Sequence, residues 1–229
     1  MSTSLVSPEF VKQTTIVSIG IQILTGLFGF QGLTIDVPRE HQILKQALVV
    51  EVIVQMIELV FYISFIVKFN LETLAATRYF DWAITTPTML FTTMAFFVYQ
   101  KNKENGNDTS FTLKEFWNSH RRDILLVVLS NFLMLLLGYL GEVGVLDRHI
   151  ALGTSFVFFF FTFYLIYTKY AHGSKYTSNM FWLLFVIWFI YGVVYMFPTE
   201  EKNISFNFLD IIAKNFFGLF LAYKINMVE

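Results

Sequence analysis

A lysine and an aspartate stand in a segment that is otherwise almost entirely apolar, NFLDIIAKNFFGLFLAY, at residues 207–223. In a helix, Lys214 would lie roughly 12 to 15 Å from either end of this segment, which is too far for its side chain to reach water. An ammonium group at that depth in a bilayer costs about 2.5 to 3.5 kcal/mol on the insertion scale. Asp210 is four residues earlier and on the same helical face. The segment therefore predicts either a simple ion pair or a chemical use for Lys214.

A second apolar segment, RYFDWAITTPTML, supplies further polar groups. Arg78 and Asp81 lie near its outer end, and Thr85 follows one turn beyond Asp81 on the same face. Within a helical bundle, Asp81, Asp210 and Arg78 could converge on Lys214. A lysine amine condenses with an aldehyde to form a Schiff base, and neighbouring carboxylates would favour its protonated form.

The elements that must position these residues are membrane spans. The chain has 229 residues, of which 55% are hydrophobic, 19% aromatic and only 14% charged. Apolar segments that approach the about 20 residues required by a bilayer core cover residues 14–30, 43–67, 79–99, 124–145, 150–170, 180–197 and 206–223. Short loops join them, so the predicted fold class is an all-α membrane protein, a seven-transmembrane-helix bundle that forms a single domain over residues 1–229. The N-terminal MSTSLVSPEF lacks a basic region, so we expect the first segment to be retained and not cleaved as a signal peptide.

The loop charges predict how the chain crosses the membrane. Most lysines and arginines fall on one side, which marks the cytoplasmic side, whereas Lys12, Lys68, Arg148 and Lys202 fall on the other. We therefore expect the N-terminus outside and the C-terminus in the cytoplasm. The net charge of −1 argues against a nucleic-acid partner, which requires a concentrated basic face. The absence of cysteine excludes disulfides and thiolate metal sites.

The motifs RYFDWAITTP and LDIIAKNFFG resemble the third and seventh helices of the microbial rhodopsins, such as bacteriorhodopsin, and the resemblance spans nearly the whole chain. It implies that Lys214 carries all-trans retinal as a Schiff base. It also implies that Asp81 is the primary counterion and proton acceptor, with Thr85 one turn away. Asp210 would be the second counterion, and Arg78 would gate the outer half.

The same resemblance implies a retinal pocket built largely from aromatic residues. Trp82, Thr86, Trp188 and Tyr191 match the positions that enclose the polyene, and Met134 and Gly138 match those at its ring end. Met89 and Tyr195 complete the predicted pocket. Aromatic side chains at helical spacing in a membrane protein usually only pack against one another. It is their combination with Lys214 that predicts contact with a ligand. Gly192 stands where a proline often follows the sixth-helix tyrosine, and Tyr195 stands where a tryptophan is common. These departures leave helix bending and pocket shape open.

The residues that would distinguish a proton pump from an ion channel lie in the second and third spans. An outward proton pump of this family has a proton donor eleven residues after Asp81, and here that residue is Thr92. The second span instead holds Glu51 and Glu58, seven residues apart on one face. Acids within a span face the bundle interior or a water-filled path, although both could be protonated and simply hydrogen-bonded between helices.

Ser18, Glu58 and Asn215 together resemble the central constriction of channelrhodopsins, and the combination resembles the first group of viral rhodopsins, which are regarded as light-gated cation channels. This implies a gate at those three residues, with Glu51 lining the inner vestibule. The sequence thus predicts a retinal-binding photoreceptor that acts as a light-gated channel for monovalent cations or protons and is not an enzyme. An outward proton pump is the alternative and a sensory rhodopsin a third reading. The oligomeric state is left open, homo-oligomers included.

Overall fold

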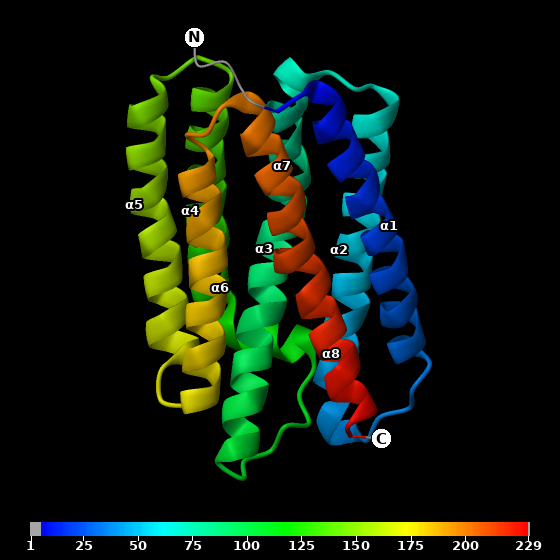
Figure 1. The fold of residues 1–229 in the computed structure, drawn as a ribbon. Helices are drawn as coiled ribbons and strands as arrows, with labels where there is room; N and C mark the ends of the chain where they lie inside the picture. The colour runs from blue at the N-terminus through cyan, green and yellow to red at the C-terminus, as the bar shows by residue number, and fades with distance from the viewer. Residues whose placement is uncertain (1–5, 229) are drawn as a thin grey trace.

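Long helices make up almost all of residues 6–228, the part of the chain that the computed structural model describes, and no strand occurs in that range (Figure 1). The α-helices are α1 (Pro8–Leu33), α2 (Gln42–Val67), α3 (Leu71–Glu104), α4 (Leu113–Glu142), α5 (Arg148–Ile166), α6 (Lys175–Val194), α7 (Thr199–Asp210) and α8 (Phe216–Asn226). A π-helical turn, η3 (Ile211–Asn215), joins α7 to α8 in one continuous rod. The described chain therefore forms seven rods, as predicted, and the beginning of α1 and the end of α8 lie at opposite ends of the bundle.

Side-chain caps fix where several helices begin. Ser7 accepts a hydrogen bond from the Phe10 backbone amide, with proline at the next position, and Asn70 caps α3 in the same way. Thr112 and Glu115 form a capping box at the start of α4. Each cap satisfies backbone amides that have no partner inside the helix. Short polar sequences therefore set the ends of the rods at the two faces of the bundle.

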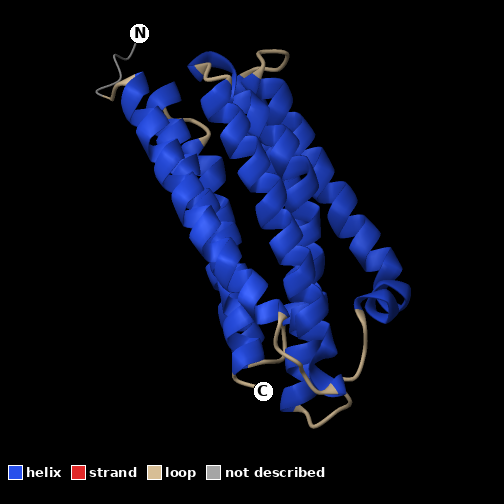
Figure 2. Cartoon of the chain, turned by 90° about the vertical axis from the view of Figure 1, so that its right-hand side faces the viewer, coloured by secondary structure: helices blue, strands red, loops and turns tan. Residues whose placement is uncertain are grey.

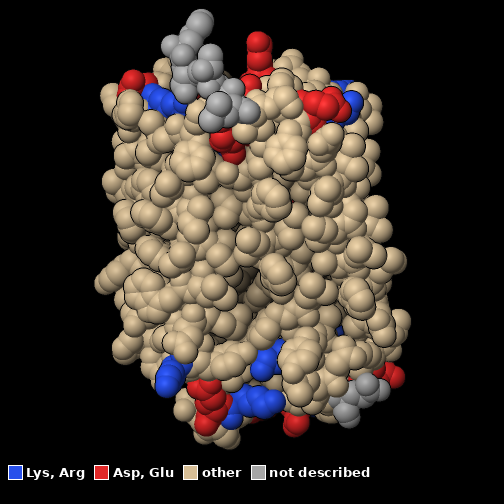
Figure 3. Space-filling model, viewed as in Figure 1, with Lys and Arg blue, Asp and Glu red and all other residues tan. Residues whose placement is uncertain are grey.

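The surface of the bundle has the distribution of a membrane protein. Charged side chains gather at the two ends of the face shown in Figure 3, with an uncharged band between them. Within the described chain, six rods are long and apolar enough to cross a membrane. The remaining rod, α3, is more polar because it contains Arg78, Asp81 and several threonines, and it buries these residues inside the bundle. The chain is an integral multi-pass membrane protein.

The observed boundaries differ from the predicted ones at several ends. The α4 helix ends at Glu142 and not at residue 145, because the chain turns at Gly144, whose φ is +75° and therefore favours glycine. The α6 helix ends at Val194, four residues before Pro198. The α3 helix is longer than the predicted 79–99, because its polar ends continue the helix beyond the apolar stretch.

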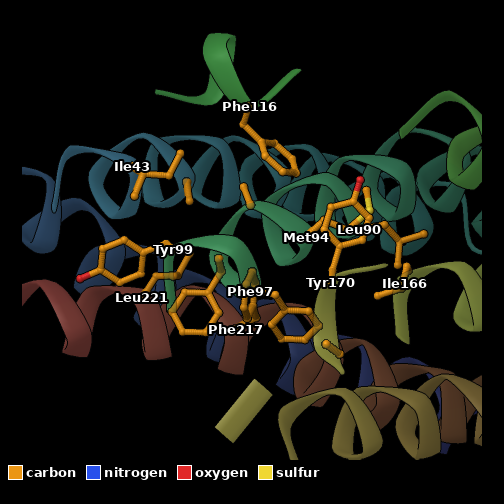
Figure 4. Close-up of a cluster of buried hydrophobic side chains, with 14 of the residues drawn as sticks. Ile43, Leu90, Met94, Phe97, Tyr99, Phe116, Ile166, Tyr170, Phe217 and Leu221 are labelled. Carbon is orange, nitrogen blue, oxygen red and sulfur yellow. The ribbon is translucent and has the colours of Figure 1, made fainter. Parts of the chain in front are cut away.

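A large hydrophobic cluster fills the half of the bundle in which α2 begins and α8 ends (Figure 4). Phe97 from α3 and Phe217 and Leu221 from α8 are almost fully buried in it. Since lipid tails are as apolar as these side chains, close packing between helices stabilises the cluster more than exclusion from water does. Figure 2 shows the same bundle from the side, with loops confined to its two ends.

The α1 helix buries its polar side chains and exposes its apolar ones, the opposite of a helix in a water-soluble protein. Its buried face is mostly polar or glycine, namely Thr14, Thr15, Ser18, Gln22, Thr25, Gly29 and Gly32. Its exposed residues include Val17, Leu24 and Leu27. A Cβ atom at Gly29 would lie 2.9 Å from the side chain of Val52, so glycine permits the close approach of α1 to α2. This rod faces lipid with its apolar side and the bundle interior with its polar side.

Candidate functional site

Three carboxyl groups surround the amine of Lys214 in the middle of the bundle. Its Nζ atom donates to Asp81 Oδ2 at 2.6 Å and lies 3.5 Å from Glu58 Oε1 and 3.8 Å from Asp210 Oδ1. All four side chains are no more than 2% exposed. The π-helical turn positions Lys214, and π turns within α-helices frequently occur at functional sites. The convergence of Asp81 and Asp210 on Lys214 is as predicted, whereas the proximity of Glu58 is new.

Asp210 is held by a nearly complete set of hydrogen-bond donors. Tyr62 and Arg78 donate to its Oδ2 atom at 2.7 and 3.2 Å. Trp82 and Tyr191 donate to its Oδ1 atom at 3.2 and 2.8 Å. Four donors on its two oxygens fix the orientation of this carboxylate.

Asp81 differs sharply from Asp210 in its surroundings. Its Oδ2 atom accepts from Lys214, but within the described chain its Oδ1 atom has no hydrogen-bond partner. Thr85 donates to the Asp81 backbone carbonyl at 2.9 Å and not to the carboxylate. Asp81 thus has one oxygen free to receive a proton, and so does Glu58, neither of whose carboxyl oxygens has a hydrogen-bond partner within the described chain.

Arg78 lies on the side of the site that faces the start of α7. Its guanidinium donates to Tyr62 at 2.8 Å, to Asn203 at 3.3 Å and to the side chain of Asn207, and it is completely buried. Sequence reasoning missed Tyr62, Asn203 and Asn207. The two asparagines stand seven and three residues before Asp210 on the same rod, and that helical spacing was the signal that could have identified them.

The charges around Lys214 are not balanced by the chain alone. Arg78 and Lys214 supply two positive charges, while Asp81, Asp210 and Glu58 supply three groups that can be negative. An unpaired charge is expensive in a buried site. With all three carboxyl groups ionised the site would carry a net charge of −1, and a proton on one of them removes that charge.

A mostly apolar cavity opens beside Lys214, lined by α3, α4, α5, α6 and the rod of α7 and η3. Every residue predicted for the retinal pocket lines it: Trp82, Thr86, Met89, Met134, Gly138, Trp188, Tyr191, Tyr195 and Lys214. Sequence reasoning missed the wall that α5 contributes, which includes Leu152, Ser155, Phe156 and Phe159. Phe156 and Phe159 lie in the run SFVFFFFTF, where composition gives no indication of which rings face inward.

The wall of this cavity depends on Gly192. A Cβ atom at that position would lie 2.5 Å from Phe156 Cζ, whereas at Gly153 it would meet no atom within 4 Å. We expect Gly192→Ala to lower the free energy of unfolding by about 1–3 kcal/mol through overpacking, and Gly153→Ala to stabilise the helix slightly by its better propensity. Thermal unfolding of both variants in detergent tests this. Equal stability of the two variants would show that the Phe156 ring moves aside freely.

The residues predicted for the ion path lie on one polar interface between α1, α2 and the α7–α8 rod. We define this polar interface by its side chains, which are Thr14, Thr15, Ser18, Gln22 and Thr25 from α1, Glu51, Gln55, Glu58 and Tyr62 from α2, and Asn203, Asn207, Asp210, Lys214 and Asn215 from α7 and η3. All of them are buried. Figure 1 shows the rods that carry them packed side by side.

The predicted gate residues do not hydrogen-bond to one another within the described chain. Ser18 donates to the Asn207 backbone carbonyl at 3.4 Å. Asn215 accepts from Thr25 at 2.7 Å, and Glu58 lies beside Lys214. The three residues therefore occupy successive points of the polar interface.

Glu51 lies seven residues before Glu58 in α2, toward the end of the bundle where α8 ends, and its carboxyl group contacts α3. Its Oε1 atom accepts a hydrogen bond from Thr92, the residue at the position of the usual proton donor. The other oxygen, Oε2, has no hydrogen-bond partner among residues 6–228. A carboxyl group therefore occupies this depth of the bundle, but it comes from α2 and not from α3.

Comparisons with known proteins agree with this arrangement. A family model described as "Bacteriorhodopsin-like protein" matches residues 11–227. Among solved structures, viral rhodopsin OLPVRII is 24% identical with a TM-score of 0.81, covering 96% of this chain and 99% of that one. Blue light-absorbing proteorhodopsin from Med12 is 20% identical with a TM-score of 0.72, covering 95% and 98%. Halorhodopsin, described as a light-driven chloride pump, is 15% identical with a TM-score of 0.71, covering 95% of each chain. No curated protein matches the sequence.

Proposed function

Because the chain belongs to the bacteriorhodopsin-like proteins, the microbial rhodopsin family, we propose that it binds all-trans retinal at Lys214 and acts as a light-gated channel for monovalent cations. The family makes it a light-driven retinal protein. The attachment residue, the retinal isomer and the channel activity are the proposed parts. We further propose that residues 1–229 form one functional domain, that the N-terminus faces outside, and that the protein performs no enzymatic turnover.

The lining of the cavity beside Lys214 supports retinal as its occupant. It is lined almost wholly by apolar and aromatic side chains and ends at an amine among carboxyl groups. Retinal attached to Lys214 would supply light absorption and photoisomerisation. Trp82, Trp188 and Tyr191 would hold the chain of the chromophore, and Met134 and Gly138 its ring end.

The two aspartates would take different parts in proton movement. Asp81, with one oxygen free of partners and the other 2.6 Å from Lys214, would accept the proton that leaves the Lys214 nitrogen. Asp210, which four donors hold, would keep its charge and orient the nitrogen. Arg78 would separate this site from the outer side.

The observation that carries the channel proposal is the polar interface itself. Polar side chains within a membrane are costly unless they face water, ions or one another, and here the polar faces of three rods meet along a continuous line. Glu58 lies 3.5 Å from the Lys214 nitrogen, and Asn215, the next residue in the chain, contacts Thr25 of α1. Movement of Lys214 would therefore disturb two points of the path at once.

One observation favours an outward proton pump as the second candidate. The hydrogen bond between Glu51 and Thr92 places a carboxyl group where a pump requires a proton donor. In a pump, Glu51 would return a proton to Lys214 from the inner side. In a channel, the same acid would attract cations into the inner vestibule.

Current recorded from illuminated cells across a series of voltages distinguishes these candidates. A channel dissipates gradients, so we expect the photocurrent to reverse near the Nernst potential of the permeant cation and to fall when a large organic cation replaces sodium. A pump keeps one current direction, since moving a charge against the membrane costs only about 2.3 kcal/mol per 100 mV. Glu58→Gln should change the conductance or the cation preference with little change in absorption.

The matched control is Glu104→Gln, because Glu104 is exposed at the end of α3. It should leave both current and absorption unchanged. An outward photocurrent that never reverses, persists without sodium and slows in Glu51→Gln would rule out the channel and support the pump.

A further inference from the structure

A second cavity, of about 510 Å³, lies at the end of the bundle where α7 begins. Charged residues from four rods line it, namely Glu72 from α3, Glu142 from α4, Arg148 from α5 and Lys202 from α7. We call it the end cavity. It brings charges of both signs together near the ends of these four rods.

Tyr195 links the end cavity to the cavity beside Lys214. It lines the cavity beside Lys214 and is only 4% exposed. The guanidinium carbon of Arg148 lies 5.1 Å from the centre of the Tyr195 ring, and the Lys202 amine lies 6.0 Å from it. A single aromatic side chain therefore contacts both the cavity beside Lys214 and two cations of the end cavity.

Two glycines of α4 make room for tyrosine hydroxyl groups at this point. A Cβ atom at Gly141 would collide with the Tyr195 hydroxyl, and one at Gly138 would lie 2.9 Å from the Tyr79 hydroxyl. Gly141 is about one helical turn beyond Gly138, the residue that we place at the ring end of retinal. Tyr195 therefore borders the proposed ring end of the cavity.

The two cations beside Tyr195 differ in how their charge is balanced. Lys202 forms an ion pair with Glu142, and the two side chains are 4% and 10% exposed. Arg148 instead donates to the backbone carbonyls of Tyr195 and Phe197, and its Nε atom has no partner within residues 6–228. Backbone carbonyls accept these hydrogen bonds without cancelling the charge. Together, Arg148, Lys202 and Glu142 therefore place a net positive charge next to the Tyr195 ring.

A charge at the ring end of the cavity acts on the energy of light absorption. Absorption moves positive charge along a protonated polyene from its nitrogen toward its ring. By Coulomb's law, a cation near the ring opposes that movement and an anion favours it. Buried charges are also screened by salt much less than exposed ones. The three charged residues can therefore act across the thickness of one side chain.

We propose that Arg148 and the pair of Lys202 with Glu142 set the absorption wavelength of the protein from the ring end of the cavity. The two cations would move the band to shorter wavelength, and Glu142 would move it to longer wavelength. The proposal rests on the proposed function, retinal bound at Lys214. It adds residues that determine which colour of light the protein uses, and it applies equally to a channel and to a pump.

A series of charges at position 148 tests this assignment, with the absorption maximum of the purified retinal-bound protein as the measurement. Arg148→Lys keeps the charge and should leave the band nearly in place. Arg148→Gln removes the charge and should move the band to longer wavelength by on the order of 10 nm. Arg148→Glu reverses the charge and should give about twice that shift. Position 148 begins α5, where an acidic residue favours the helix.

Glu142→Gln provides an independent second test. It removes a negative charge from the same group of residues, so the band should move to shorter wavelength. The matched control is Lys68→Gln, because Lys68 is exposed at the end of α2 and lines neither cavity. Its band should stay in place. Thermal unfolding of the retinal-free variants shows, independently of the band, which of them keep the fold.

Band shifts that follow the sign and size of the charge support the assignment. Equal shifts in Arg148→Gln and Arg148→Glu, or shifts in one direction in Arg148→Gln and Glu142→Gln, would indicate distortion of the cavity and overturn it. An unchanged band in the folded variants, or loss of the band from all of them, would overturn it as well. An unmodified protein without a visible band would instead overturn the proposed retinal function.

Discussion

Lys214→Ala should abolish the visible absorption band completely. Only a primary amine forms a Schiff base with an aldehyde, and Lys214 is the lysine that lines the apolar cavity. The variant leaves buried carboxylates unpaired, which is destabilising by about 3–5 kcal/mol in comparable sites. Lys214→Arg therefore provides the second test, since it keeps a positive charge without a primary amine. Absorption spectra after purification with retinal, together with borohydride trapping, measure the result.

The control for this experiment is Lys224→Ala, on the same rod at its inner end. Lys224 lies over the rings of Tyr176 and Phe220 and does not line the cavity. It should keep the visible band. Retention of the full band in Lys214→Arg, with retinal still trapped covalently, would place the attachment at another residue.

Asp81→Asn should shift the absorption band to longer wavelength at neutral pH. Asp81 lies 2.6 Å from the Lys214 nitrogen, and at an effective dielectric constant of about 20 a charge pair at that distance interacts by about 6 kcal/mol. Removing the negative charge destabilises a cation localised at the nitrogen, so less energy is needed to excite it. Acid titration of the unmodified protein should produce the same shift as Asp81 becomes protonated.

Asp210→Asn, compared with Asp81→Asn, tests which of the two aspartates is the main counterion. Asparagine at position 210 cannot accept well from both Arg78 and its three neutral donors, so we expect a marked loss of thermal stability as well as any change in colour. A spectrum of Asp81→Asn identical to that of the unmodified protein, combined with a large shift in Asp210→Asn, would transfer the main counterion role to Asp210.

The rods and the centre of the site could be predicted because their signals are local. Apolar length predicted the spans, and the four-residue spacing of Asp210 and Lys214 placed both on one helical face. The polar residues Arg78 and Asp81 in a second apolar segment indicated that both could converge on Lys214, and the family resemblance implied their roles. All the residues predicted for the retinal pocket line one cavity.

The remaining details depend on how the rods are rotated against one another, which no local pattern encodes. Glu58 was predicted as part of a gate, yet it also lies beside the Lys214 amine. Gln22 and Gln55 were not predicted as part of the polar interface, because the sequence does not show whether a glutamine in an apolar span is buried. In α1, apolar composition alone could not reveal that the few polar residues share the buried face.

The π-helical turn at Ile211–Asn215 has a consequence for how this chain tolerates insertions and deletions. A π turn accommodates one residue more than an α-helical turn, and one residue in an α-helix corresponds to about 100° of rotation. Deleting a residue there would turn Lys214 and all of α8 away from the faces that α7 presents. The loop at residues 105–108 can change length with little effect, because it lies outside the helices. Length variation among homologous chains should therefore be found in such loops and be excluded from this turn.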